Sequence, residues 1–284
     1  QRTGDSRNLT WVKGQRERIL RLVGQDNLQG VSIFDPVLCE LAYRWFCPEG
    51  GKVLDPFAGG PVRGIVAAVL GRHYTGIDLN PAQIAANEAQ WPLAVGQEKA
   101  KGSVAWVAGD SRNVKTLAPG EYDFLFTCPP YFNLEQYSYV PEDLSNAADY
   151  AQFLESYREI LAASWGLLKE NRFACICVGD IRDKRGYYRN FVSDTITAFR
   201  DLGGHLYNEA VLVVAVGSLP LRVGRSFGKW RKLGKEHQNV LVFLKGDIKA
   251  IPDVLGEVAI PERLDWGAPV SPDFHETEVS TDGD

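Results

Sequence analysis

The chain has 284 residues, of which 45% are apolar and 24% are charged, the composition of an ordinary globular protein. No apolar run reaches the ~18 residues of a membrane-spanning helix, no signal-peptide pattern is visible, and five cysteines without a metal-ligand spacing favour a reduced, cytoplasmic setting. The net charge of -5 argues weakly against a nucleic-acid partner, but this charge is unevenly distributed along the chain.

Short apolar segments alternate with helical patterns along residues 33–247. The strand candidates are 53–57, 73–78, 104–110, 122–128, 173–180, 206–216 and 239–245. The helix candidates are 35–47, 61–71, 81–91, 149–169 and 189–202. This alternation predicts an α/β fold, a doubly wound, Rossmann-like and mostly parallel sheet of about seven strands. Only a loop is expected between the last two strands, so we predict that they pair as an antiparallel hairpin at one edge.

Two flanking segments lack this pattern. Residues 1–32 are polar and mixed in charge and are expected to form an N-terminal arm. Residues 248–284 form a C-terminal extension; from residue 271 on it holds five acids and neither Lys nor Arg, so we expect disorder there. Within the alternating region, residues 217–238 carry six Lys/Arg and one Glu. This basic loop is either a phosphate-binding surface or an ordinary solvated loop.

The first strand ends in an acid and a glycine-rich turn, "VLDPFAGGPVRG" at 53–64. Gly59 and Gly60 allow the backbone to approach a ligand closely. Asp55 is placed to accept hydrogen bonds from a ligand's ammonium group, directly or through water. The turn is not G-x-G-x-x-G, so a ligand other than a dinucleotide is favoured.

The next two strands also end in acids. Asp78, in "GIDLNP", lies about 20 residues after the glycine turn, where an acid can bind ribose hydroxyls. Asp110, in "AGDS", is placed to accept from an adenine amino group. Each Asp alone is also ordinary turn chemistry. However, Cys128 ends the fourth strand, and four successive polar strand ends predict a ligand site at the carboxyl edge of the sheet.

The fourth strand runs into "TCPPY" at 127–131. Pro129 and Pro130 cannot donate ladder hydrogen bonds, and they fix the backbone where the chain leaves the sheet. Tyr131 follows directly.

With this turn, the sequence resembles the S-adenosylmethionine-dependent DNA base methyltransferases, particularly the small phage-type enzymes. The similarity covers roughly residues 33–247 and is carried by "FDPVLCELAYRWF" (34–46), "VLDPFAGG" (53–60), "GIDLNP" (76–81), "GDSR" (109–112), "TCPPY" (127–131), "FACICVGDIRD" (173–183) and "KLGKEHQNVLVFLKGD" (232–247). It implies a catalytic domain over 33–247, S-adenosyl-L-methionine (SAM) as cofactor, DNA as partner and a cytoplasmic location, in the host cell for a phage enzyme. The implied cofactor residues are Phe57, Gly59, Asp78 and Asp110, with Asp35 and Pro36 near the methionine end.

The resemblance also implies that the turn receives a base flipped out of the duplex, because the target atom is inaccessible inside the stack. Tyr131 would stack on this base, and the prolines would keep the first residue of the turn in place. Glu135 is either an acceptor for the N4 amine of cytosine or an exposed loop acid.

Cys128 stands where the resemblance implies Asp, Asn or Ser. A thiol is a weak hydrogen-bond acceptor, but Cys is nearly isosteric with Ser. In the family that the sequence resembles, Ser at this position is typical of enzymes that methylate cytosine N4. Alternatively, the thiolate of Cys128 adds to C6 of cytosine and activates C5. Cytosine C5 is slightly favoured over N4, and adenine N6 ranks behind both; a buried structural role is a further alternative. Cys175 and Cys177 are two residues apart on one strand, so their side chains face the same side, and both are predicted to lie in the core.

The candidates for DNA contact are basic residues of the loop 217–238 and of the segment 182–189. They are Arg182, Arg222, Arg225, Lys229, Arg231, Lys232, Lys235 and His237. Phe227 and Trp230 could wedge into the gap left by a flipped base. Two other functions stay open at this point: a catalytically silent nucleic-acid-binding module, and a methyltransferase that acts on RNA or protein.

Overall fold

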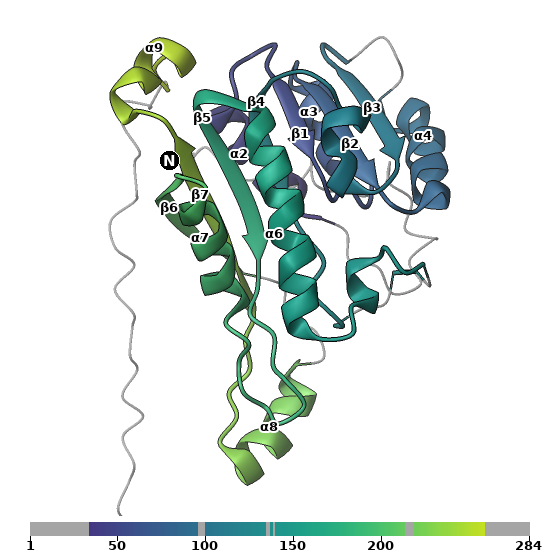
Figure 1. Cartoon of the computed structure of the whole chain (residues 1–284), viewed down its shortest axis with the longest axis vertical. Helices are drawn as coiled ribbons and strands as arrows, with labels where there is room; N and C mark the ends of the chain where they lie inside the picture. Colours follow the sequence, from purple (N-terminus) through teal and green to yellow (C-terminus); the bar gives the residue numbers. More distant parts are fainter. Residues whose placement is uncertain (1–33, 96–99, 135–136, 139, 214–218, 259–284) are drawn as a thin grey trace, which may run out of the picture.

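A computed structural model describes residues 34–95, 100–134, 137–138, 140–213 and 219–258. Within these ranges, seven strands form one sheet in the order β3-β2-β1-β4-β5-β7-β6 (Figure 1). The strands are β1 (Lys52–Asp55), β2 (His73–Asp78), β3 (Ser103–Ala108), β4 (Tyr122–Thr127), β5 (Leu168–Val178), β6 (His205–Val213) and β7 (His237–Lys245). Strands β1 to β5 are parallel, and β7 pairs antiparallel with both β5 and β6. The predicted doubly wound, Rossmann-like sheet with a final antiparallel hairpin is confirmed.

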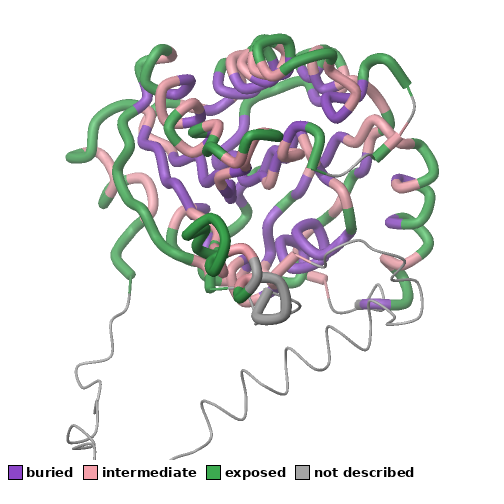
Figure 2. Tube along the Cα trace, turned by 90° about the horizontal axis from the view of Figure 1, so that it is seen from below, coloured by how far each residue is buried: buried purple, intermediate pink, exposed green. Residues whose placement is uncertain are grey.

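Helices cover both faces of the sheet. One face packs on α2 (Pro36–Phe46), α3 (Val62–Val69) and α4 (Pro81–Val95), and the other on α5 (Val114–Leu117), α6 (Tyr150–Leu167) and α7 (Phe191–Asp201). Short 3-10 turns lie at Ser111–Asn113 (η2), Leu144–Asn146 (η3) and Ile248–Ala250 (η4), and α9 (Ile251–Leu255) follows the last of them. In the view from below, the buried residues lie at the centre and the exposed ones around them (Figure 2).

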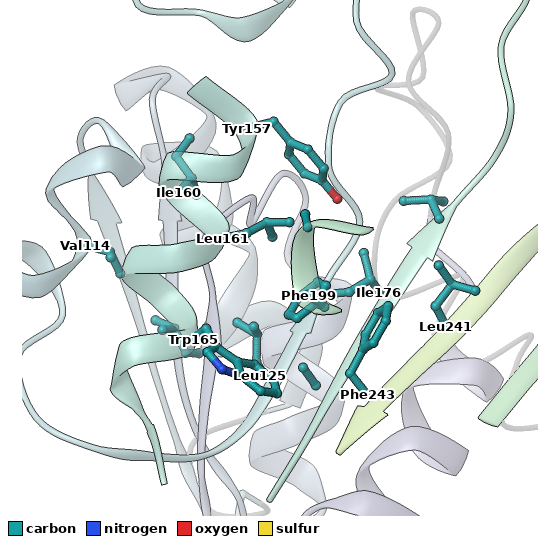
Figure 3. Close-up of a cluster of buried hydrophobic side chains, with 14 of the residues drawn as sticks. Val114, Leu125, Tyr157, Ile160, Leu161, Trp165, Ile176, Phe199, Leu241 and Phe243 are labelled. Atoms are coloured by element: carbon teal, nitrogen blue, oxygen red, sulfur yellow. The ribbon is translucent and has the colours of Figure 1, made fainter. Parts of the chain in front are cut away.

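The central strands are buried on both faces because helices cover each side. In β4, Leu125 joins the core under α6 and α7, while Phe124 and Phe126 join the core under α2 and α3. The first of these cores is shown in Figure 3, where the ring of Phe199 stacks on that of Phe243 with centroids 4.2 Å apart. Burial on both sides explains why such strands read as continuous apolar runs in the sequence.

The main correction concerns the basic segment 217–238. It was predicted to be a loop, but the structure forms α8 at Leu219–Trp230. Glycine and proline lower helix propensity there, yet Val223, Phe227 and Trp230 recur at helical spacing. The helix lies beyond the carboxyl ends of β4 and β5, at the opposite end of the molecule from α9 (Figure 1).

The flanking segments are only partly described. The predicted arm at 1–32 and the tail from 271 lie outside the described residues, whereas η4 and α9 begin the C-terminal extension. Among the helices of the described part, none combines the length and the apolar character that crossing a bilayer requires. Cys175 and Cys177 are fully buried, as predicted.

Candidate functional site

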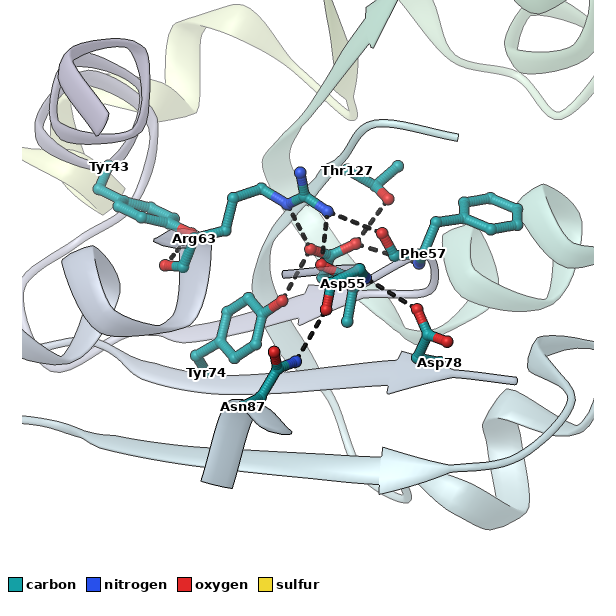
Figure 4. A network of polar contacts seen from close by, with 10 residues as sticks. Tyr43, Asp55, Phe57, Arg63, Tyr74, Asp78, Asn87 and Thr127 are labelled. Carbon is teal, nitrogen blue, oxygen red and sulfur yellow. Dashed lines mark hydrogen bonds and ion pairs between the residues drawn. The ribbon is translucent and has the colours of Figure 1, made fainter. Parts of the chain in front are cut away.

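A buried ion pair organises the turn after β1 (Figure 4). Asp55, the last residue of β1, is 0% exposed, and its Oδ2 accepts from Nε of Arg63 at 2.6 Å and from the hydroxyl of Tyr74 at 2.8 Å. Its Oδ1 accepts from the hydroxyl of Thr127 at 2.6 Å and from the backbone N–H of Phe57 at 3.1 Å. Nη2 of Arg63 donates in turn to the carbonyls of Phe57 (2.7 Å) and Ala58 (2.9 Å).

These contacts correct the predicted role of Asp55. Four protein donors occupy its carboxylate, and no part of the residue is exposed, so it does not present an oxygen to a ligand. It is a positioning residue that joins the carboxyl ends of β1 and β4 and also binds the hydroxyl of Tyr74, which comes from β2. Arg63 was missed, although a lone charge in the apolar helix "VRGIVAAV" is a signal that could have found it.

Gly59, in the turn after β1, and Asp78, the last residue of β2, lie at the carboxyl edge of the sheet beside open space. The backbone N–H of Gly59 donates to Oδ2 of Asp78 at 2.9 Å, and the Gly59 carbonyl accepts from Nδ2 of Asn87 at 2.7 Å. Gly59 has a φ of +50°, and no atom lies within 4 Å of the position that a Cβ would take. Burial raises the pKa of Asp78, while the N–H groups of Asn80 and Gly59 act in the opposite direction. Open space therefore adjoins a hydrogen-bonding backbone turn and a carboxylate.

Phe57, predicted to line the cofactor site, is partly buried beside this turn, with its ring centroid 6.2 Å from that of Tyr157. Asp35 caps α2, where its Oδ1 accepts from the N–H groups of Val37 (2.8 Å) and Leu38 (3.1 Å). Pro36, buried, is the first residue of that helix. Asp35 therefore has a local structural role at the start of α2.

Asp110 lies at the end of β3 but is already engaged. Its Oδ2 accepts from Nε (2.9 Å) and Nη2 (2.6 Å) of Arg112. Burial raises the pKa of Asp110, but the hydrogen bonds from Arg112 outweigh it, so the net pKa is lowered and the group stays ionised. A ligand amine would share this carboxylate with Arg112. The neighbouring Ser111 donates to the carbonyl of Pro56 at 2.5 Å and so ties β3 to the first turn.

The Cys-Pro-Pro-Tyr turn begins directly after Thr127, which binds Asp55. Cys128 is partly buried, and its Sγ lies 3.9 Å from the hydroxyl oxygen of Tyr131. The ring of Tyr131 packs edge-on against Phe191, with centroids 6.0 Å apart, and lies beside Gly179. The structure thus places the turn next to the Gly59–Asp78 edge.

Cys128 differs from the other four cysteines in exposure and in acidity. The remaining thiols are buried. Burial raises the pKa of Cys39, of Cys175 and of Cys47, the last to about 12, while the hydrogen bond to Cys128, together with burial, raises the pKa of Cys177. For Cys128 a hydrogen bond from Cys177 lowers the pKa, burial opposes it, and the positive charge of Arg63 and the hydroxyl of Tyr131 lower it further. The net direction is downward, which favours the thiolate.

Two neighbours of this thiol were not predicted as site residues. Cys177 is buried as expected, yet its Sγ borders the turn and lies 3.2 Å from Oε1 of Gln238, so its single S–H donates either to Gln238 or to the thiolate of Cys128. The stem of Gln238, in β7, also lies near Gly179. No local pattern in the sequence reveals this contact, because it depends on the register between β5 and β7.

The predicted DNA-contacting residues differ in exposure and in their contacts. Four of them are exposed: Lys229 on α8, Arg231 and Lys232 directly after it, and His237 at the start of β7. Some cations are engaged within the protein: Lys235 donates to Asn239 at 3.0 Å, Arg231 to the carbonyl of Gly228 at 2.7 Å, and Arg182 to the carbonyl of Gly186 at 2.8 Å. Glu135 and the side chains of Arg222 and Arg225 lie outside the described part.

No protein-family model matches the sequence, and no curated protein matches it either. Solved structures match in fold. TrmN from Thermus thermophilus is 16% identical, with a TM-score of 0.50 over 79% of this chain, which spans only 52% of TrmN. Precorrin 8w decarboxylase from Methanobacterium thermoautotrophicum is 14% identical, with a TM-score of 0.51 over 82% of this chain and 98% of its own. SMU.776, solved in complex with SAH, is 15% identical, with a TM-score of 0.50 over 75% of this chain and 50% of its own.

The buried ion pair predicts a large loss of stability. Arg63→Leu removes one partner and leaves the Asp55 carboxylate uncompensated, so the free energy of unfolding in urea should fall by about 3–5 kcal/mol. Arg158→Ala, which breaks the exposed pair with Asp201 (3.3 Å), is the control and should cost at most about 1 kcal/mol. Equal losses in the two variants would contradict the assigned role.

The thiol contacts predict a hierarchy of reactivity. Iodoacetamide should label Cys128 before the other cysteines, as measured by peptide mass spectrometry of the folded protein. Cys177→Ala removes the largest contribution that lowers the pKa, so the labelling rate of Cys128 should rise only at higher pH than in the wild type. Cys175→Ala, on the same strand, is the matched control. An identical profile in both variants would refute the Cys177 contact.

Proposed function

We propose that the chain is a SAM-dependent methyltransferase that modifies a flipped-out base of DNA, with cytosine as the target. The observation that carries this proposal is the meeting of two turns at one edge of a Rossmann-like sheet. The open Gly59–Asp78 turn and the Cys-Pro-Pro-Tyr turn are joined through the hydrogen bond from Thr127 to Asp55. In open α/β sheets, ligands bind at this carboxyl edge.

The residues at the first turn fit the proposed cofactor. The carboxylate of Asp78 can accept from ribose hydroxyls, and the open side of Gly59 admits a ligand close to the backbone. Phe57 offers a ring beside the same space. The solved complex of SMU.776 with SAH, which shares this fold, supports the choice of cofactor. Bound SAM would supply an electrophilic methyl group.

Cys128 is proposed to act as a nucleophile toward cytosine. Its thiolate adds to C6, and the ring electrons then make C5 nucleophilic. After C5 is methylated, loss of the C5 proton expels the sulfur and restores the aromatic ring. The lowered pKa and partial exposure of Cys128 support this role, whereas a thiol is a weak acceptor for merely orienting an amine.

The helix α8 is proposed to bind the DNA backbone. It extends past the carboxyl ends of the parallel strands (Figure 1) and presents Lys229 together with Phe227 and Trp230, which are 45% and 70% exposed. Exposed cations can bind the phosphates of a nucleic acid, and exposed aromatic rings beside them can stack on its bases.

Two variants of the turn separate the possible reactions. Cys128→Ser and Cys128→Ala should both lose methylation while they keep their affinity for SAM and DNA, because neither hydroxyl nor methyl can add to C6. DNA that contains 5-fluorocytosine should trap the wild type covalently, since fluorine blocks the elimination. A Cys128→Ser enzyme that is fully active and makes N4-methylcytosine would instead show that Cys128 only orients the amine.

Salt dependence tests the role of α8. Replacing Lys229 and Lys232 with Ala should reduce the slope of log K against log salt by about 0.9 for each lost phosphate contact, measured by fluorescence anisotropy on duplex DNA. SAM affinity should not change. Lys249→Ala, in η4 at the opposite end of the molecule, is the control and should leave the slope unaltered. An unchanged slope in the α8 variant would make this helix a solvated surface.

A further inference from the structure

The loop between β5 and α7 brings Arg189 to the back of the Cys-Pro-Pro-Tyr turn. Its backbone is fixed by a hydrogen bond from the Arg189 N–H to the carbonyl of Ile181 (2.9 Å) and by the neighbouring bridge between Arg182 and Tyr188. The loop therefore leaves the sheet and returns next to the candidate site, where Arg189 is its last residue before the α7 cap, Asn190.

The guanidinium of Arg189 lies over two aromatic rings. Its central carbon is 5.0 Å from the centroid of Phe132 and 5.0 Å from that of Tyr150. Phe132 directly follows Tyr131, is only 4% exposed and has a φ of +51°. A left-handed conformation is unfavourable for a bulky residue and persists only where packing enforces it. Arg189 is part of the packing that holds the turn in this conformation.

The charge of Arg189 has no acceptor in the described part of the chain. Its Nε is buried without a hydrogen-bond partner, and no carboxylate lies within ion-pair distance. The nearby acids are engaged elsewhere: Asp194 accepts from the hydroxyl of Tyr150 at 2.7 Å, and Asp180 accepts from the N–H of Val192 at 3.2 Å. A half-buried guanidinium whose Nε is unpaired, beside the Cys-Pro-Pro-Tyr turn, is suited to bind an anion.

We propose that Arg189 binds a phosphodiester of the polynucleotide beside the target base and couples this contact to the position of the Cys-Pro-Pro-Tyr turn. The proposal rests on the proposed function, because it requires a nucleic-acid substrate. A guanidinium can stack on rings through its faces while its edge N–H groups bind phosphate oxygens. With the target base at Tyr131, the phosphates of the same nucleotide would lie beside this turn. Phe132, the next residue, carries Arg189 over its ring.

Two substitutions separate the charge from the stacking. Arg189→Met keeps an unbranched apolar stem and removes the charge; duplex DNA binding should weaken by about 10- to 100-fold, with a loss of about 0.9 in salt slope and a lower kcat. Arg189→Lys keeps the charge but not the planar stack, so the slope should be retained while kcat stays low. Arg185→Met, in the exposed part of the same loop, controls for the loss of one loop charge and should have little effect.

SAM affinity, measured by calorimetry, reports folding in every variant. If Arg189→Met lowers kcat but keeps the DNA affinity and salt slope of Arg185→Met, the residue only packs the turn and the phosphate contact is refuted. Wild-type protein that neither binds nor methylates DNA would refute the proposed function and this inference with it. Wild-type methylation combined with an unaffected Arg189→Met would refute the inference alone.

Discussion

The buried ion pair between Asp55 and Arg63 is the interaction on which the candidate site depends. Removing two charges from water is costly, and this cost is offset because both oxygens of Asp55 and the Nε and Nη2 groups of Arg63 are hydrogen-bonded. These same bonds fix the turn after β1 and the end of β4. The pair therefore decides where the open edge at Gly59 lies and where Cys128 begins its turn.

A chain of aromatic rings links the two turns on the other face of the sheet. Phe57, from the first turn, lies 6.2 Å from Tyr157, which lies 5.2 Å from Phe191, and Phe191 lies 6.0 Å from Tyr131. Such contacts are rigid because protein interiors are close-packed. The proposed cofactor and target-base sites thus share one polar support and one aromatic support.

Periodicity and turn residues were sufficient to predict the mostly parallel seven-stranded sheet, its final antiparallel pair and most of the helices between the strands. They could not predict which strand-end acids face inward: Asp55 and Asp78 look alike in the sequence, and only the position of Arg63 and Tyr74 makes the first structural. Nor could they reveal the contact of Cys177 with Gln238, 61 residues apart, since register is set by tertiary packing. The segment Leu219–Trp230 forms α8 because its apolar residues recur at helical spacing, although its glycines lower the helix propensity.

The central claim is that the two turns together transfer a methyl group to a DNA base. The most direct measurement is to incubate the wild-type protein with plasmid DNA and SAM carrying a labelled methyl group, digest the DNA to nucleosides and identify the labelled base by chromatography and mass spectrometry. The proposed function predicts label in 5-methylcytosine. Label in no nucleoside, with SAM bound and DNA retained by the protein, would contradict the claim.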